Sequence, residues 1–174
     1  VHRQKTLRVQ EALREALRLH REGKANEAER LYQAVLKVRP DNFDALHSLG
    51  VLRGQQGRHE EAVRLISRAL KRDPGSAEAY SNLGNVMAGL SRHEEALASY
   101  DKALAIRPGY VHVLTGRGNL LVKLKRYVEA LASYDQAVAS SPNHAEALNN
   151  RANVLQELGR HDEALASYEK VLAN

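Results

Sequence analysis

The sequence RHEEALASYDKALA runs from Arg92 to Ala105 and returns twice further along the chain. It reappears as RYVEALASYDQAVA from Arg126 to Ala139 and as RHDEALASYEKVLA from Arg160 to Ala173, each copy 34 residues after the previous one. Residues 77–106 and 145–174 are identical at 18 of 30 aligned positions. A strict period of this length is typical of proteins that are built from stacked repeats.

The period extends through most of the 174 residues and divides them into five repeats. A proline stands near the end of each of the first four repeats, and a small residue recurs in each half of the repeat. We number the repeats 1 to 5 and expect their boundaries at 9–42, 43–76, 77–110, 111–144 and a truncated 145–174, after an N-terminal helical extension, 1–8. The repeated residues are Pro40, Pro74, Pro108 and Pro142; Ala28, Ala62, Ala96, Ala130 and Ala164; and Gly50, Gly84 and Gly118, with Ala152 in the next copy.

Each repeat carries the pattern of two helices. Residues 80, 83, 84, 87 and 90 follow the spacing of a buried helical stripe. A break with Gly57 or Gly159 follows in two of the copies, and acidic residues then open the second helix, where the helix dipole favours them. The proline ends that helix because it disfavours helical angles in the residue before it. Each helix pair leaves an apolar face that only the next pair can cover, so the repeats must stack.

These marks resemble the tetratricopeptide repeat family, and the resemblance covers the chain beyond residue 8. In repeat 3 the family pattern is carried by Tyr80, Leu83 and Gly84 on the first helix, and by Ala96, Tyr100, Ala103 and Pro108 on and after the second. The resemblance implies an all-α fold, a right-handed α-solenoid of five stacked helix-turn-helix repeats.

Composition excludes several functional classes. The chain has no Cys, so disulfides, thiolate metal sites and thiol nucleophiles are absent. No apolar run approaches the ~20 residues of a membrane span, and no signal-peptide core follows the basic N-terminus, so we expect a cytoplasmic protein without membrane contact. The chain starts at Val1 and its one Met is Met87, so we expect a fragment of a longer protein.

The net charge of +5 does not indicate nucleic-acid binding. The excess lies in residues 1–42, with ten Lys and Arg against six Asp and Glu. There Arg14 and Arg18 follow Glu11 and Glu15 by three residues, the spacing of ion pairs along a helix. No aromatic residues alternate with the basic ones to stack on bases. We therefore expect no nucleic-acid partner.

No pattern predicts catalysis or a bound metal or cofactor. His59, His93 and His161 share one repeat position, but Tyr127 occupies it in repeat 4, which favours packing over metal binding. HEEAV from His59 lacks the second His of a zinc-protease motif, and GRG at 116–118 has no strand before it. Tyr32, Tyr100, Tyr134 and Tyr168 recur on the second helices, and we expect them to belong to the core rather than to a stacking surface. The interpretation is a protein without enzyme activity, metal or cofactor.

A ligand would bind on the surface of the first helices, which line the concave side of such a stack. Repeat positions 2, 5, 6, 9, 12 and 13 are expected to face away from the core. Asn recurs among them, although it is a mediocre helix former. Predicted groove residues for a peptide are His47, Ser81, Asn82, Asn85, His112, Thr115, Asn119, Asn149, Asn150 and Asn153.

Two interpretations of the recurring Asn remain open. The amides could cap backbone groups or hydrogen-bond between neighbouring repeats. Alternatively they form a ladder on one continuous concave surface, where each amide donates to and accepts from an extended peptide backbone. The ladder resembles the Asn-lined repeat arm of protein O-linked N-acetylglucosamine transferases and related bacterial proteins. The carboxylate clamp of chaperone adaptors is absent, because Ser81, Gly116 and Glu146 stand where it requires Lys, Asn and Lys.

The sequence thus predicts a scaffold that binds a protein or peptide partner. Two alternatives are the substrate-recruiting arm of a larger glycosyltransferase and a self-assembly module. The second is favoured by the last helix, which leaves Leu165, Tyr168 and Leu172 without a following repeat to cover them. A homo-oligomer through that helix is therefore possible; otherwise we expect its last turn to fray.

Position 7 of the repeat departs from the family pattern. It is Leu49 and Leu83 in repeats 2 and 3 but becomes Arg117 and Arg151 in repeats 4 and 5. The preceding repeats carry Asp101 and Asp135 on their second helices, where the earlier repeats have Gln33 and Ser67. A partly buried Arg needs a charge partner. We therefore predict ion pairs between repeats, Arg117 with Asp101 and Arg151 with Asp135.

Overall fold

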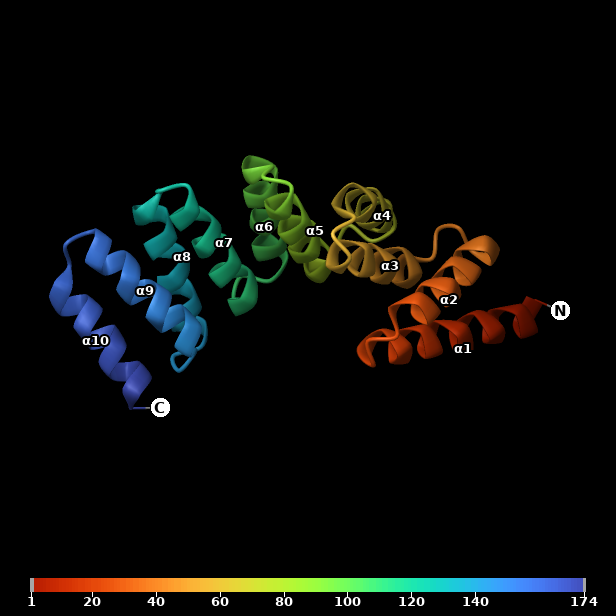
Figure 1. Cartoon of the computed structure of the whole chain (residues 1–174), viewed down its shortest axis with the longest axis horizontal. Helices are drawn as coiled ribbons and strands as arrows, with labels where there is room; N and C mark the ends of the chain where they lie inside the picture. The colour runs from red at the N-terminus through yellow and green to blue at the C-terminus, as the bar shows by residue number, and fades with distance from the viewer. Residues whose placement is uncertain (1, 174) are drawn as a thin grey trace. The chain divides into compact units, whose positions relative to one another are not determined.

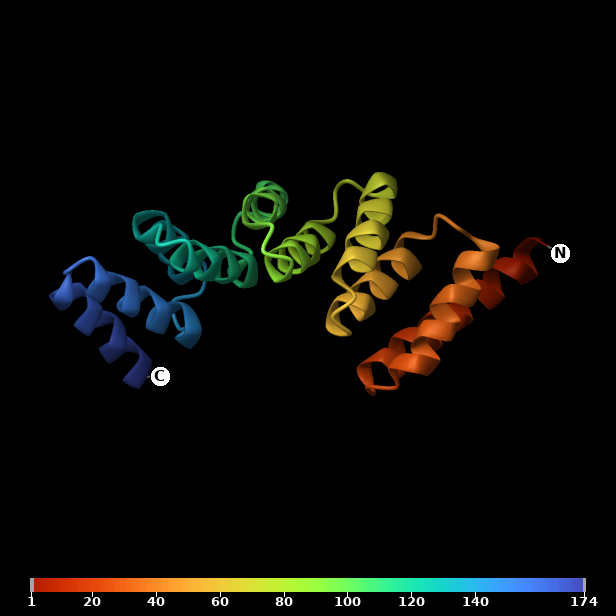
Figure 2. The same ribbon diagram turned by 45° about the horizontal axis from the view of Figure 1, so that its top comes forward.

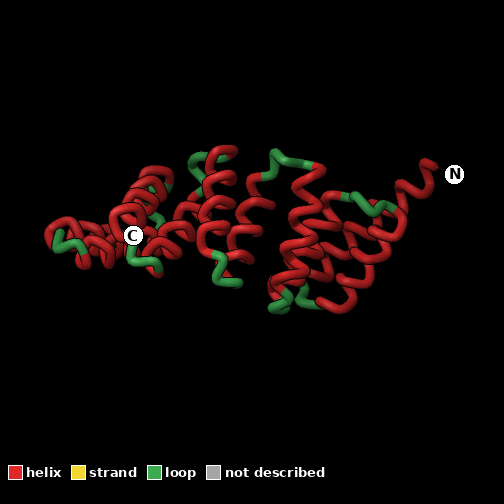
Figure 3. The backbone as a smooth tube through the Cα atoms, turned by 90° about the horizontal axis from the view of Figure 1, so that it is seen from above, coloured by secondary structure: helices red, strands yellow, loops and turns green. Residues whose placement is uncertain are grey.

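The computed structural model describes residues 2–173, with side chains from Arg8 to Ala173. Ten helices account for nearly all of this range, and Figure 3 shows them joined by short loops, with no strand among the described residues. Figure 1 labels the helices in chain order. Their bounds are α1 His2–Arg21, α2 Ala25–Val38, α3 Phe43–Gln55, α4 His59–Arg72, α5 Ala77–Gly89, α6 His93–Ile106, α7 Val111–Lys123, α8 Tyr127–Ser140, α9 Ala145–Glu157 and α10 His161–Leu172.

The helices form five consecutive pairs, as the sequence predicts. In Figure 2 α1 lies beside α2 at one end of the chain and α9 beside α10 at the other, and both pairs are in contact. The chain divides into two compact units, residues 1–91 and 92–174. The first unit holds α1 to α5 and the second holds α6 to α10.

The turn inside each pair requires one residue in the left-handed region. Gly23, Gly57 and Gly159 have φ of 76°, 75° and 72°, which costs glycine little. Ser91 and Lys125 take the same place in the other two turns, each with φ of 59°. The repeat geometry therefore holds the backbone of Ser91 and Lys125 in a conformation that non-glycine residues rarely adopt.

Helix starts follow a different rule in the two halves of the repeat. Three first helices use a side-chain cap: Asn42 Oδ1 accepts from the Ala45 amide at 2.8 Å, Ser76 Oγ from the Ala79 amide at 3.1 Å and His144 Nδ1 from the Ala147 amide at 3.2 Å. Helix α7 begins after Tyr110 without such a cap. The second helices α4, α6, α8 and α10 instead each begin after an Arg whose side chain binds the Glu three residues later. These pairs are Arg58–Glu61, Arg92–Glu95, Arg126–Glu129 and Arg160–Glu163, each with a nitrogen–oxygen distance of 2.6 or 2.7 Å.

Small residues let the two helices of a pair approach closely. A Cβ built on Gly50 would lie 2.6 Å from the Ile66 side chain, and one built on Gly118 would lie 2.5 Å from the Tyr134 ring. The five alanines of the recurring position on the second helices are all 0 or 1% exposed. Both positions therefore need small side chains because larger ones would separate the helices.

The predicted ion pairs between repeats are confirmed. Arg117 Nε donates to Asp101 Oδ1 at 2.8 Å, and Arg151 Nε donates to Asp135 Oδ1 at 2.6 Å. Each guanidinium also donates from Nη1 to a serine on the second helix of its own repeat, Ser133 at 2.7 Å and Ser167 at 2.6 Å. The arginine thus joins three helices, and its side chain is 22% exposed in both cases.

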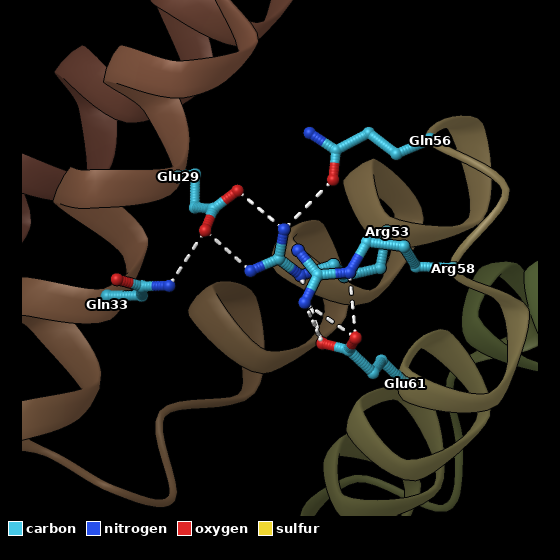
Figure 4. A network of polar contacts seen from close by, with 6 residues as sticks. All are labelled: Glu29, Gln33, Arg53, Gln56, Arg58 and Glu61. Atoms are coloured by element: carbon cyan, nitrogen blue, oxygen red, sulfur yellow. Dashed lines mark hydrogen bonds and ion pairs between the residues drawn. The ribbon is translucent and has the colours of Figure 1, made fainter.

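A different ion pair lies between repeats 1 and 2. Arg53 is 5% exposed, and its guanidinium binds both oxygens of Glu29 at 2.5 Å. Figure 4 shows Gln56 accepting a further hydrogen bond and Glu61 on the other side, 2.9 and 3.4 Å from the guanidinium. In the other repeats the position of Arg53 holds Leu19, Met87, Leu121 or Leu155, and that of Glu29 holds Val63, Leu97, Leu131 or Leu165. A charged pair here replaces an apolar contact.

Candidate functional site

The Asn side chains of the second compact unit are tied to tyrosines on the second helices. The Tyr134 hydroxyl on α8 donates to Asn119 Oδ1 on α7 at 2.6 Å. Asn150 Nδ2 on α9 donates to the same oxygen at 2.9 Å. Asn119 thereby links its own repeat to the next one, while its amide NH₂ lies 3.5 Å from a Glu146 carboxylate oxygen.

The last repeat contains the same arrangement. The Tyr168 hydroxyl on α10 donates to Asn153 Oδ1 on α9 at 2.6 Å. Asn119 and Asn153 are both exposed, so the carbonyl end of each amide is fixed while the residue remains accessible to solvent. The Asn153 NH₂ has no hydrogen-bond acceptor among the residues described. An amide held in this way presents a donor whose direction is already set.

These side chains line a depression of about 470 Å³ on the second compact unit. Its wall combines amide groups with apolar and aromatic surface from α7, α8 and α9. Burial raises the pKa of Tyr134, so its hydroxyl stays protonated and able to donate at neutral pH. The lining residues are Asn119, Val122, Tyr127, Tyr134, Asn150, Asn153, Val154, Gln156 and Glu157.

The first compact unit has a smaller amide site of its own. Asn82 Nδ2 on α5 lies 2.9 Å from His47 Nε2 on α3, and the His47 ring stacks on Phe43 with centroids 5.6 Å apart. Burial lowers the pKa of His47, which keeps the ring neutral and its nitrogen able to accept. Asn82 and Asn85 line a depression of about 300 Å³ beside His59 and Gln55.

Three of the predicted groove residues are buried rather than available to a ligand. His47, Ser81 and Thr115 are 8, 2 and 3% exposed, and all three occupy position 5 of the repeat. The reason is that consecutive first helices also touch, α3 with α5 and α7 with α9, so position 5 lies under a neighbouring helix. The Thr115 hydroxyl donates to the Val111 carbonyl of its own helix at 2.9 Å.

The remaining predicted residues stay at the surface to different extents. Asn85, His112, Asn119 and Asn153 are exposed, and Asn82, Asn149 and Asn150 are half-buried. The amides are therefore neither sequestered between helices nor without neighbours. The interpretation of hydrogen bonding between helices is confirmed for Asn119 and Asn153, whose carbonyl oxygens accept from tyrosines of the second helices. The peptide ladder stays a prediction.

Sequence reasoning placed the tyrosines in the core and missed their hydroxyl groups. Tyr32, Tyr100 and Tyr134 are 0, 3 and 1% exposed, so the prediction of core residues is confirmed for these three, whereas Tyr168 is only half-buried. The Tyr134 hydroxyl in addition orients Asn119. The sequence does hold a signal for this contact between Tyr and Asn, in the residues that occur together at positions 9 and 24 of the repeat. Asn at position 9 occurs only together with Tyr at position 24, in repeats 3, 4 and 5. Repeat 2 has Val51 with Ile66, and repeat 1 has Leu17 with Tyr32.

Among the described residues, no group of three or more His, Asp or Glu side chains is arranged to hold a metal ion. None of their helices is long and apolar enough to cross a membrane.

Comparison with known proteins identifies the repeat. A tetratricopeptide repeat profile matches residues 13–66 and 47–111, and a second tetratricopeptide repeat profile matches residues 109–174. None of the curated proteins matches the sequence. These findings do not support the predicted likeness to the repeat arm of protein O-linked N-acetylglucosamine transferases.

Solved structures share the architecture. A crystal structure of MamA superposes with a TM-score of 0.84 at 23% identity, covering 91% of this chain and 92% of that one. PilF of Pseudomonas aeruginosa gives a TM-score of 0.86 at 18% identity, covering 95% of this chain and 75% of that one. At such identities the likeness shows the fold alone.

A third structure is closer in sequence. The thermophilic tetratricopeptide repeat protein TTC0263 of Thermus thermophilus is 27% identical, with a TM-score of 0.73, and the match covers 95% of this chain and 90% of that one. The family profiles together span residues 13–174, which hold all five helix-turn-helix repeats. The chain belongs to the tetratricopeptide repeat family.

Proposed function

We propose that the chain is a protein-interaction scaffold without catalytic activity, which binds an extended peptide segment on the surface of its first helices. The observation that carries this proposal is the fixed orientation of the groove amides. Tyr134 and Tyr168 hold the carbonyl oxygens of Asn119 and Asn153 at 2.6 Å, which leaves the Asn153 NH₂ as a donor and the Asn119 NH₂ with one hydrogen beyond its 3.5 Å bond to Glu146. Donors that are oriented before binding cost less ordering entropy when a ligand arrives.

The chemistry of these donors suits a peptide backbone. An extended segment presents a carbonyl oxygen at every residue, about 3.3 Å along the chain from the last. Amide side chains can donate hydrogen bonds to those oxygens whatever the peptide's own side chains are. We assign the binding to Asn82 and Asn85 in the first compact unit and to a second set in the other unit. That second set is His112, Asn119, Asn149, Asn150 and Asn153.

A pool of randomised twelve-residue peptides tests the proposal. The chain is immobilised and the bound fraction of the labelled pool is measured for the native protein and for the variant N119D/N153D. Each aspartate keeps an oxygen to accept from its tyrosine but loses the NH₂ donor, so the fold should persist while binding falls about tenfold, for two lost hydrogen bonds. The variant N119A/N153A repeats the test without the added charge.

The matched control is N26A/N143A, which removes two exposed amides outside these depressions. Circular dichroism confirms that each variant is folded. The proposal predicts loss in both groove variants and none in the control. Equal retention by all four proteins, or no retention by the native chain, would contradict it.

A further inference from the structure

The depression of the second compact unit carries one charged side chain, Glu157 at the C-terminal end of α9. The other residues that line it are amides, tyrosines and valines, and none of them is basic. Glu157 is exposed and makes no ion pair with any residue that the structure describes. By contrast, Glu129 and Glu163 of the same unit are each bound by an arginine, at 2.7 and 2.6 Å. Glu157 therefore offers its charge to a ligand.

The exposure of Glu157 follows from its place in the repeat. Position 13 is held by Arg21, Gln55 and Lys123 in repeats 1, 2 and 4, and all three residues are exposed. Each of these repeats is followed within its own compact unit by another repeat, whose first helix packs against it. Position 13 thus stays open to solvent beside a following repeat.

The depression itself is a feature of two neighbouring repeats. Its smaller counterpart in the first compact unit is lined by the same positions, 6, 9 and 10 of the later repeat and 9, 12 and 17 of the earlier one. Val122 takes the place of Gly54, and Tyr127 takes the place of His59. The smaller depression has no acidic side chain. The larger one therefore offers more apolar surface together with a negative charge.

A second carboxylate adds to this negative charge from the other end of α9. Glu146 lies 3.5 Å from the amide nitrogen of Asn119. Burial is the main cause of the raised pKa of Tyr134, and the charge of Glu146 raises it further, so this carboxylate lies close to the tyrosine hydroxyl. Glu146 and Glu157 are eleven residues apart, about three helical turns, so they share one face of α9 with the asparagines between them.

An apolar wall with an acid at its edge matches the shape of a basic side chain. Lysine and arginine bury their methylene stems on apolar surface and keep the charged end beside a carboxylate. Val122 and the half-buried ring of Tyr127 form part of that wall, and aromatic rings also attract cations. An acidic side chain would meet Glu157 with the same sign of charge.

We infer that the depression of the second compact unit is a specificity subsite, in which Glu157 binds a lysine or arginine side chain of the peptide. The inference rests on the proposed function, because the asparagines that hold the peptide backbone line the same depression. It adds a preference for one kind of side chain to backbone contacts that are independent of the peptide sequence. Val122 and Tyr127 contact the stem, and Glu157 pairs with the charge.

Three pools of twelve-residue peptides test the subsite. All have a randomised background of Ala, Ser, Gly and Gln, with lysine, norleucine or glutamate fixed at the sixth residue. Norleucine keeps the four-carbon stem of lysine without its charge. The retained fraction of each labelled pool is measured on the immobilised chain. The native protein should retain the lysine pool about fivefold more than the norleucine pool, the upper end for an accessible ion pair, and the glutamate pool least.

Variants of Glu157 separate the charge from the rest of the site. E157Q should bring the lysine pool down to the norleucine pool without changing the retention of norleucine, and E157K should favour the glutamate pool. The matched control E27Q removes an exposed carboxylate of α2 and changes the net charge equally, so the preference for lysine should persist.

Two kinds of failure can be told apart. Equal retention of the lysine and norleucine pools by the native chain, or a preference that survives E157Q, would overturn the inference and leave the proposed function intact. Retention of no pool by the native chain would overturn both.

Discussion

At the scale of single residues, Arg151 shows how one side chain joins two repeats. Its Nε binds Asp135 on the preceding repeat, and its Nη1 binds Ser167 on its own. The aspartate was predictable because it changes together with the arginine along the sequence. The serine was not, because serine also stands at position 23 in repeat 3, where position 7 is Leu83. Its hydroxyl also donates to the Glu163 carbonyl at 3.0 Å, a bond that needs no arginine.

Reversing the charges of this pair tests its contribution to stability. Arg151→Asp and Asp135→Arg should each destabilise the chain, and the double reversal should recover part of the loss. We expect a coupling free energy of about 1 kcal/mol, at the upper end for accessible ion pairs, because the Arg151 side chain is only 22% exposed. Urea unfolding of the four proteins measures it.

The matched control is the same cycle on Arg160 and Glu163, which pair within one helical turn and are 46 and 48% exposed. Their coupling should be clearly smaller, because solvent screens the pair. Strictly additive effects at Arg151 and Asp135 would show that the contact does not hold the repeats together.

The Arg53–Glu29 pair can be replaced by the apolar residues that other repeats carry at the same two positions. Glu29→Leu alone should cost about 3 kcal/mol, since it leaves a buried guanidinium without its main partner. The double variant E29L/R53L reproduces the Leu131 and Leu155 combination of a later junction and should be at least as stable as the native chain. Equal stability of E29L and native protein in urea unfolding would contradict the buried-pair description.

The same pair predicts a dependence on pH. Hydrogen bonding from Arg53 lowers the pKa of Glu29 below its ordinary value of 4.5. A lowered pKa in the folded state stabilises the fold above the ordinary value, and this contribution is lost as the pH falls through the lower, folded value. The native chain should therefore lose more stability than E29L/R53L between pH 5 and acid conditions, about pH 3, in thermal melts. Parallel losses in both proteins would argue against the linkage.

At the scale of helices, the periodicity of the sequence predicted the pairs, their turns and the small residues at their crossings. It mispredicted position 5, where His47, Ser81 and Thr115 are buried. Periodicity within one helix separates the side facing its partner from the opposite side. It carries no information on a neighbouring first helix that packs against part of that opposite side.

The close approach of α7 and α8 can be tested at one atom. Gly118→Ala places a Cβ 2.5 Å from the Tyr134 ring, which is 1% exposed and enclosed between helices. We expect a loss of about 1–3 kcal/mol in unfolding free energy, as for other overpacked sites. The reverse change Ala152→Gly, at the same repeat position, should cost only the helix propensity of glycine, about 1 kcal/mol. A stabilised G118A protein would show that the helices separate easily.

At the scale of the whole molecule, the repeated sequence specifies a series of helix pairs, and function depends on what the repeats place at the surface. The Asn series was predictable from its spacing, because Asn is unusual within helices. The tyrosine hydroxyl groups that orient Asn119 and Asn153 were not predictable in the same way, since Tyr134 reads from the sequence as a core residue and its ring is indeed buried. One side chain thus serves packing and site geometry together.

In the proposed function, the NH₂ groups of the Asn side chains on the first helices bind a peptide backbone. Side-chain amide resonances of ¹⁵N-labelled protein test it directly during titration with the tightest peptide from the randomised pool. We expect saturating shifts for the NH₂ signals of Asn119, Asn150 and Asn153, with those of Asn26 and Asn143 unmoved. Shifts at other side chains while those three stay fixed would contradict the claim.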